Sequence, residues 1–257
     1  MDETTKKQLQ FLGLRYLQEN WDNILKEPQK KQPSYQRFLT DIIEKEHMDK
    51  KERSRLYRIK KANIPELWVM ETFPFSKQPR LKKKLVIELY DSLRYITEKQ
   101  ELIFIGPTGC GKSGLATAFL VHAINQGYRG YFIDFGQLIR QLYQSKADHS
   151  EHKLIRRFQA YDALLVDEIG YDHLEKEQAG LFFDLMKARN KKRTTILTTQ
   201  FGFEEWGSFL HNDHLTAALI DRITVNCTIF NMKDCISVRP NNTIQATNNH
   251  EAQAKDK

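Results

Sequence analysis

Short apolar runs in the middle and C-terminal parts of the chain dominate its hydrophobic pattern. They are rich in Leu, Ile, Val, Phe and Thr, and they occupy residues 102–105, 130–135, 161–168, 193–200 and 227–231. Runs of this length are typical of strands that are covered on both faces of a sheet. Segments with apolar residues at helical spacing separate them. The alternation predicts an α/β fold, a parallel sheet flanked by helices.

The N-terminal part has apolar residues at helical spacing only. They repeat at largely helical intervals from Leu9 to Trp21, and the polar residues 27–33 are expected to form a linker. Ser34 is a suitable N-cap for a long helix that continues to about residue 61. Lys51, Arg55 and Arg58, at i, i+4 and i+7, would form one basic face of this helix. Leu56 and Ile59 lie off that face and are expected to pack inward.

The pattern divides the chain into three parts. We expect a small all-helical N-terminal domain over residues 1–65, because Ile64-Pro65 ends the long helix. The α/β domain then covers residues 66–240. Residues 241–257 are rich in Asn, Gln, Lys and Ala and lack aromatic residues, so we expect a disordered tail.

Charge is distributed unevenly along the chain. Residues 1–100 hold 22 Lys and Arg against 15 Asp and Glu, whereas residues 101–257 hold 18 of each. A basic N-terminal part attached to a neutral domain suggests contact with a polyanion. The density is highest in residues 45–61, with eight Lys and Arg against three acids. A solvated helix face is the alternative explanation, and Glu52 among the cations supports it. We predict contact with double-stranded DNA through Lys51, Arg55, Arg58, Lys60 and Lys61.

A glycine-rich segment follows the apolar run at 102–105. It reads Gly106-Pro107-Thr108-Gly109-Cys110-Gly111-Lys112-Ser113, which matches the Walker A phosphate-binding pattern, with a strand expected before it and a helix after it. The glycines allow backbone N–H groups to surround an anion at the start of the helix. Lys112 is then expected to reach the outer phosphates of ATP, and the Ser113 hydroxyl to bind Mg²⁺. Together with Gly114, these residues form the predicted nucleotide site; a glycine-rich turn without a ligand is the alternative.

Two acidic residues end the apolar run at 161–168. Leu164-Leu165-Val166-Asp167-Glu168 matches the Walker B pattern, in which a buried strand carries two carboxylates to its carboxyl end. Asp167 is expected to hold Mg²⁺, and Glu168 to orient or deprotonate the attacking water. An Asp-Glu pair that merely ends a strand is the alternative.

Four further residues are candidates for catalysis. Thr199 and Gln200 end the strand expected between the two Walker strands, so either is a candidate sensor of the γ-phosphate. Arg222 is a candidate arginine finger for the ATP of a neighbouring subunit, with a surface Asp221-Arg222 pair as the alternative. Arg239 follows the last strand and is a candidate contact to the γ-phosphate in its own subunit.

Other features limit the cellular setting. No apolar stretch approaches the ~18 residues that a membrane-spanning helix needs, and the acidic start Met1-Asp2-Glu3 is unlike a secretory signal. The three cysteines Cys110, Cys227 and Cys235 are an odd number without paired metal-binding spacing, so we expect reduced thiols. These features predict a cytoplasmic protein.

The order of the motifs resembles the IstB/DnaC-like clade of AAA+ ATPases, and most of all the IstB-like helper ATPases encoded beside the transposase of two-gene insertion sequences. The resemblance covers about residues 5–240 and rests on the two Walker motifs and on Tyr35-x-x-Phe38-Leu39, Thr198-Thr199-Gln200, Phe203-Glu204-Glu205-Trp206, Asp221-Arg222-Ile223 and Ser237-x-Arg239. The chain departs from the clade at Gln200, where Asn is common, and at Cys110 and Ser113, where Thr is common.

The resemblance implies an AAA+ P-loop NTPase core with a helical N-terminal domain. It also implies Mg²⁺-dependent ATP hydrolysis, a homo-oligomer formed with ATP on double-stranded DNA, DNA bending, and recruitment or stimulation of a partner IstA-like transposase. Arg222 would act on a neighbouring subunit and Arg239 on its own.

Two other functions are compatible with the same motifs. A DnaC-like replicative helicase loader shares the ATPase core but uses its N-terminus to bind a helicase, whereas the basic excess here suits duplex DNA. A small-molecule P-loop kinase requires an acceptor pocket and a mobile lid, and it does not require Glu168 after the Walker B aspartate.

Overall fold

A five-stranded parallel sheet lies at the centre of the α/β part of the chain. The computed structural model describes residues 1–31, 33–171 and 174–235. The sheet consists of β1 (Glu101–Ile105), β2 (Gly130–Asp134), β3 (Ala163–Ile169), β4 (Thr194–Thr199) and β5 (Cys227–Asn231), in the order β2-β3-β4-β1-β5. Each strand coincides with a predicted apolar run, and every pairing is parallel. The prediction of a parallel sheet is confirmed, and β4 lies between the two Walker strands as expected.

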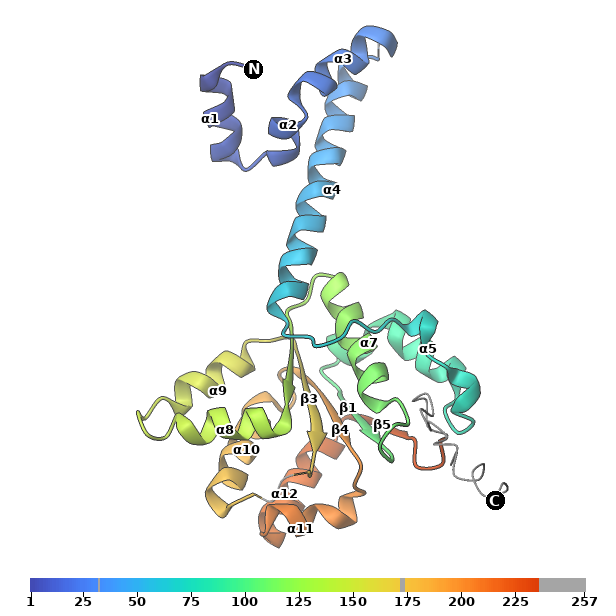
Figure 1. The fold of residues 1–257 in the computed structure, drawn as a ribbon, viewed down its shortest axis with the longest axis vertical. Coiled ribbons are helices and arrows are strands. Elements are labelled where there is room, and N and C mark those ends of the chain that lie inside the picture. The colour runs from blue at the N-terminus through green and yellow to red at the C-terminus, as the bar shows by residue number, and fades with distance from the viewer. Residues whose placement is uncertain (32, 172–173, 236–257) are drawn as a thin grey trace, which may run out of the picture.

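Helices cover both faces of the sheet (Figure 1). One face carries α5 (Lys83–Ser92), α6 (Arg94–Thr97) and α7 (Lys112–Asn125), with the short helices η1 (Met70–Thr72) and η2 (Phe75–Lys77) nearby. The other face carries α8 (Phe135–Gln144), α9 (Glu151–Gln159), α10 (Lys176–Arg189), η3 (Phe203–Glu205), α11 (Trp206–Leu210) and α12 (Asp213–Thr224). Alternate residues of β1 point to opposite faces, so Phe104 and Ile105 belong to different hydrophobic clusters.

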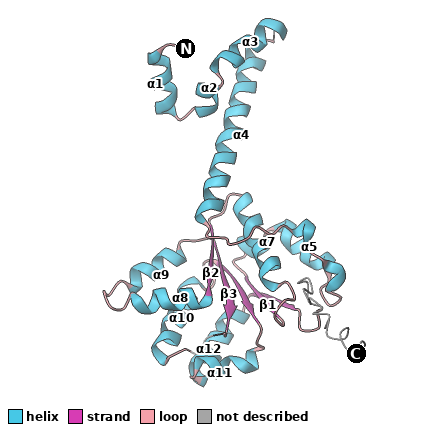
Figure 2. Ribbon diagram, in the orientation of Figure 1, coloured by secondary structure: helices cyan, strands magenta, loops and turns pink. Residues whose placement is uncertain are grey.

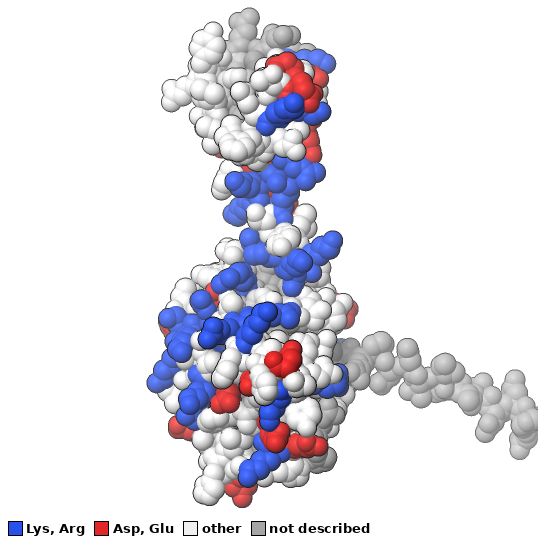
Figure 3. All heavy atoms as spheres, turned by 90° about the vertical axis from the view of Figure 1, so that its left-hand side faces the viewer, with Lys and Arg blue, Asp and Glu red and all other residues white. Residues whose placement is uncertain are grey.

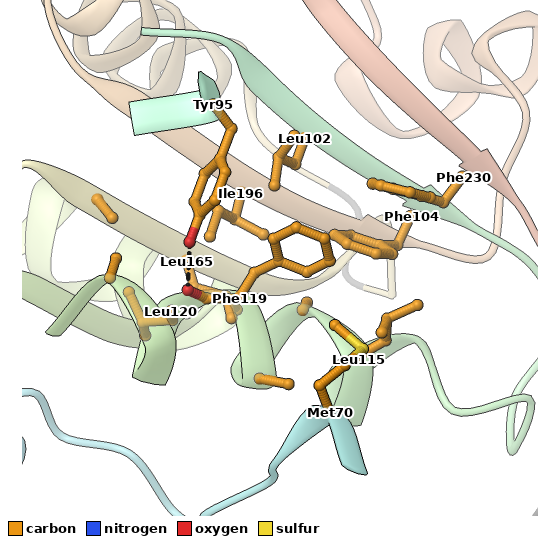
Figure 4. Close-up of a cluster of buried hydrophobic side chains, with 14 of the residues drawn as sticks. Met70, Tyr95, Leu102, Phe104, Leu115, Phe119, Leu120, Leu165, Ile196 and Phe230 are labelled. Atoms are coloured by element: carbon orange, nitrogen blue, oxygen red, sulfur yellow. Dashed lines mark hydrogen bonds between the residues drawn. The ribbon is translucent and has the colours of Figure 1, made fainter. Parts of the chain in front are cut away.

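Aromatic side chains fix α7 on the sheet (Figure 4). Phe119 of α7 lies among the rings of Tyr95, Phe104 and Phe230. The Phe104 and Phe230 rings are stacked with their centroids 4.5 Å apart, and the Tyr95 hydroxyl donates a hydrogen bond of 2.8 Å to the Phe119 carbonyl. These contacts hold the start of α7, and therefore the glycine-rich segment before it, in a fixed position over β1.

The N-terminal helices form an arm that extends from the sheet (Figures 1 and 2). They are α1 (Glu3–Leu12), α2 (Arg15–Glu19), α3 (Trp21–Lys31) and α4 (Tyr35–Lys61). Gly13 separates α1 from α2 with a left-handed backbone at φ 70°. The Ser34 side chain accepts a hydrogen bond from the Arg37 amide, which confirms the predicted start of the long helix.

The structure corrects three expectations about helices. The linker expected at 27–33 is largely helical, because α3 continues to Lys31 and most residues there favour helices. Leu56 was expected to pack inward but is 52% exposed; only the side of α4 that carries Ile59 meets the core. The helical spacing of Leu85, Leu89, Leu93 and Ile96 predicts one helix, but the structure interrupts it at Leu93, whose φ is 53°. The predicted tail at 241–257 lies outside the described residues.

Within the described ranges, the structure contains no helix with the length and apolar character required to cross a bilayer.

Candidate nucleotide-binding site

The glycine-rich loop lies where β1 passes into α7. The Gly106 amide donates to the Thr199 carbonyl of β4 at 3.1 Å. A side chain at Gly106 would come within 2.8 Å of the Met232 backbone, so only glycine fits this approach. Gly111 has φ 92°, a left-handed conformation that glycine adopts without strain, immediately before α7 begins at Lys112. The loop therefore has the strand-to-helix setting that its sequence predicted.

A cavity of about 380 Å³ lies over this loop. Residues from four segments of the chain line it: Glu66, Trp68, Thr108, Gly109, Gly111, Lys112, Ser113, Gly114, Glu168, Tyr171, Thr199 and Gln200. Gly106, Pro107 and Cys110 do not line the cavity. Cys110 is buried, and its backbone carbonyl accepts a hydrogen bond of 2.6 Å from the side-chain amide of Gln78. The structure thus brings most of the predicted nucleotide-binding residues together with Glu168 around one hollow.

Ser113 and Asp167, the predicted magnesium ligands, are in direct contact. Burial raises the pKa of the Asp167 carboxyl, whereas hydrogen bonds from Thr198 and Ser113 and the charge of Lys112 lower it. A hydroxyl and a carboxylate are the hard oxygen donors that Mg²⁺ prefers. The described residues contain no cluster of three or more His, Cys, Asp or Glu side chains suited to a metal. A magnesium site completed by phosphate and water needs only one or two protein oxygens, so this pair fits the ion.

Glu168 differs from Asp167 in backbone and exposure. Its φ is 63°, in the left-handed region, and the pairing of β3 with β4 shifts register between Val166 and Ile169. This irregularity turns the exposed Glu168 side chain toward the cavity, while Asp167 stays buried beside it. The two carboxylates are consecutive in sequence but occupy different environments, as their predicted roles require.

Thr198 of β4 joins the two acidic residues. Its hydroxyl donates to the Asp167 carboxylate and accepts a hydrogen bond of 2.9 Å from the Glu168 amide. Its two successors, Thr199 and Gln200, were predicted sensors, whereas Thr198 had no predicted role. The only sequence signal was its place in the Thr-Thr-Gln motif, which does not reveal a contact across strands.

The two candidate sensors have different surroundings. The Thr199 hydroxyl is buried, donates to the Ile169 carbonyl at 2.9 Å and accepts from the Phe201 amide at 3.1 Å. Gln200 is half-buried and lines the cavity. Because the Thr199 hydroxyl is engaged with the backbone, the geometry favours Gln200 for contact with a ligand.

Three other residues that line the cavity had no predicted role. The Tyr171 hydroxyl is 2.8 Å from the Thr108 hydroxyl at one side of the loop. Glu66 and Trp68 enter the cavity from the segment between α4 and α5. None of the three belongs to a phosphate-binding motif, and only the fold places them here.

Of the two candidate arginines, only Arg222 lies within the described residues. Arg222 lies in the last turn of α12, with its guanidinium 4.6 Å from the centre of the Phe183 ring and a hydrogen bond of 2.9 Å to the Ala218 carbonyl. It is outside the lining of its own chain's cavity, which is compatible with a role on a neighbouring subunit. Arg239 lies outside the described residues.

The model of the family described as IstB-like ATP binding protein matches residues 6–246. The chain belongs to this family. The putative ATP-binding protein of insertion sequence IS21 from Pseudomonas aeruginosa is 32% identical to this IstB-like protein over 88% of its chain and 84% of the relative. The putative ATP-binding protein of insertion sequence IS5376 from Geobacillus stearothermophilus is 31% identical over 91% of this chain and 92% of the relative.

Solved structures confirm the AAA+ fold of the IstB-like protein. DnaI superposes with a TM-score of 0.55 at 15% identity, covering 65% of this chain and 91% of DnaI. The DnaC helicase loader gives a TM-score of 0.50 at 23% identity, covering 61% and 90%. DnaA from Aquifex aeolicus with bound AMPPCP gives 0.53 at 16% identity, covering 64% and 50%. The predicted AAA+ core and the predicted family are therefore correct.

The basic residues that we predicted to contact DNA lie in the C-terminal part of α4, the end of the helix nearest the sheet. Lys51, Lys60 and Lys61 are exposed. Arg55 and Arg58 instead contact the end of α7: Arg55 donates to the Asn125 side chain at 3.2 Å and Arg58 to the Ile124 carbonyl at 3.3 Å. Arg55 also pairs with Glu52. The two arginines therefore brace the IstB-like protein's arm against its AAA+ core.

The structure also reveals a basic surface on the core. Figure 3 shows Lys and Arg side chains gathered on α4 near the sheet and on the adjoining face of the α/β part. In α8 and α9 the exposed cations are Arg140, Lys153, Arg156 and Arg157. The net charge of residues 101–257 did not predict this basic surface, because acidic residues elsewhere in the same range balance its positive charges.

Proposed function

We propose that this IstB-like protein hydrolyses ATP with Mg²⁺ and, while ATP is bound, oligomerises on double-stranded DNA to recruit or stimulate a partner transposase in the cytoplasm. The observation that carries the proposal is the position of Glu168, which faces the glycine-rich loop across one cavity beside the Ser113–Asp167 pair. Matches along most of the chain to ATP-binding proteins of insertion sequences support the setting.

The residues divide the reaction among them. The amides of residues 109–114 hold the phosphates, and Lys112, which now donates to the Pro107 carbonyl at 2.9 Å, turns to their outer oxygens. Mg²⁺ held by Ser113 and Asp167 would neutralise charge on the phosphates. Glu168 orients the attacking water or accepts its proton. Gln200 contacts the γ-phosphate, Arg222 supplies positive charge from the neighbouring subunit, and Arg239 does so within its own.

An ATPase assay tests this function. With ATP and Mg²⁺, phosphate release should rise when duplex DNA is added, and electron microscopy of the same mixture should show multimers on the DNA. No ATP turnover with or without DNA would refute the proposal. Pull-downs distinguish a transposition helper from a helicase loader. A helper should retain a transposase encoded beside it, whereas a loader should retain a replicative helicase. The likeness to the DnaC helicase loader is one of fold only, and the family match favours the helper.

The exposed lysines at the base of α4 give a testable DNA contact. The double variant K60A/K61A should lower the slope of log Kd against log salt by about 0.9 for each phosphate contact removed, because each contact releases counterions. Fluorescence anisotropy with a labelled duplex at several salt concentrations measures this slope. Lys176→Ala, an exposed lysine at the start of α10, is the control. A double variant with the parental slope would exclude Lys60 and Lys61 as phosphate contacts.

A further inference from the structure

The segment between α4 and α5 reaches the nucleotide cavity and contributes Trp68 to it. The segment is held on the core at several points: Met70 and Phe73 are buried, and the Phe132 amide of β2 donates to the Ala62 carbonyl at 2.8 Å. Trp68 lies between these anchors, half-buried, and packs against the same hydrophobic cluster as α7. Its position is therefore set by the fold.

The Trp68 ring lies beside the first turn of α7. A Cβ atom at Gly114 would be 3.0–3.3 Å from three atoms of the indole, so the absence of a side chain at position 114 leaves room for the ring. Gly114 follows Ser113, whose hydroxyl contacts Asp167. The contact thus places Trp68 one residue beyond the predicted magnesium ligand and on the lining of the same cavity.

Residues near the cavity differ in the part of a nucleotide that they suit. Asp167, Glu168 and Gln200, at the carboxyl ends of β3 and β4, are suited to the outer phosphates and the attacking water. With the phosphates bound at the start of α7, the sugar and base of a nucleotide would extend toward Trp68, which lies beside Gly114 on the lining of the same cavity. An indole offers a broad aromatic face, and stacking on such a face is the common way in which proteins bind a nucleobase.

We propose that Trp68 binds the base of the nucleotide by stacking its indole on the purine ring. This inference rests on the proposed ATP binding and adds the residue that holds the end of the nucleotide farthest from the reaction. Because stacking does not involve the phosphates, Trp68 contributes to affinity for nucleotides and not to affinity for a phosphate chain alone.

Binding measurements on the full chain separate the base from the phosphates. Calorimetry with ATP and with inorganic tripolyphosphate, both with Mg²⁺, is carried out on the parent, Trp68→Ala and Trp68→Phe. Loss of stacking should weaken ATP binding about tenfold in Trp68→Ala, with a smaller loss in Trp68→Phe, whose ring still stacks. Tripolyphosphate should bind all three equally. Trp21→Phe, which removes an indole from α3, is the matched control.

Tryptophan fluorescence tests the stacking without the Trp68→Ala variant, so the test does not depend on whether that variant folds. Of the three tryptophans, Trp206 is fully buried and Trp21 lies on the arm. In the Trp21→Phe background, ATP should therefore quench the remaining emission through Trp68, tripolyphosphate should not, and the added Trp68→Phe change should remove the response.

Unchanged ATP affinity in folded Trp68 variants, an equal loss for ATP and tripolyphosphate, or absence of the ATP-specific quench would overturn the inference while leaving ATP binding intact. A parent protein that binds neither ligand would instead refute the proposed function, so the two failures are distinguishable.

Discussion

Glu168→Gln should stop ATP turnover while leaving ATP bound. The amide that replaces the carboxylate keeps the size of the side chain but cannot accept a proton from water, so kcat should fall about 10³-fold. The phosphate loop and the Ser113–Asp167 pair are untouched, and ATP affinity should stay within about twofold, because the lost interaction acts mainly in the transition state. The variant should accumulate as ATP-bound assemblies on DNA.

Phosphate release and ATP calorimetry on the same preparation measure the two effects. Glu88→Gln, an exposed glutamate of α5 remote from the cavity, is the matched control and should behave as the parent. Parental turnover in Glu168→Gln would show that another group activates the water.

Thr198→Val should slow hydrolysis about 10²-fold, the cost of misplacing a catalytic group by about 1 Å. Valine keeps the shape of threonine but removes the hydroxyl that joins the Asp167 carboxylate to the Glu168 amide. Glu168 then loses the partner that holds its backbone in the left-handed conformation. Thr198 is not among the residues that line the cavity, so it would act as a positioning residue through Asp167 and Glu168. We therefore expect kcat to change far more than ATP affinity.

Serine distinguishes the hydroxyl from the shape of the side chain. Thr198→Ser retains the hydroxyl and should recover most of the lost turnover. Thr228→Val, on the edge strand β5, is a control for introducing valine into the sheet. If the serine and valine variants are equally slow, the methyl group and its packing matter and the hydrogen-bonded bridge does not.

The sequence predicted the α/β fold because the decisive signals are local. Buried parallel strands appear as short apolar runs, and a phosphate loop requires glycines, Lys112 and Ser113 in an unbroken stretch. The predicted positions of all five strands were confirmed. The prediction was wrong in the arm at two places: α3 continues through most of the predicted linker at 27–33, and Leu56 does not pack inward because another side of α4 meets the core.

Thr198 and Trp68 escaped prediction for a different reason. The hydroxyl of Thr198 matters because β4 lies beside β3, about 30 residues away in sequence. Trp68 matters because its ring lies beside Gly114 in the first turn of α7 and on the lining of the cavity. Contacts of this kind arise from the packing of elements and leave no periodic trace in one sequence. The basic surface of α8 and α9 was hidden similarly, since a net charge averages over residues that face different directions.

The left-handed backbone at Glu168 has a consequence for the evolution of this site. A side chain at φ 63° costs about 1–2 kcal/mol that glycine would not incur. Stability and turnover are therefore opposed at this position: Glu168→Gly would relax the chain and raise its melting temperature while removing the reactive carboxylate. Selection for stability alone would replace this glutamate. Its retention would therefore indicate an insertion sequence that is still under selection for transposition.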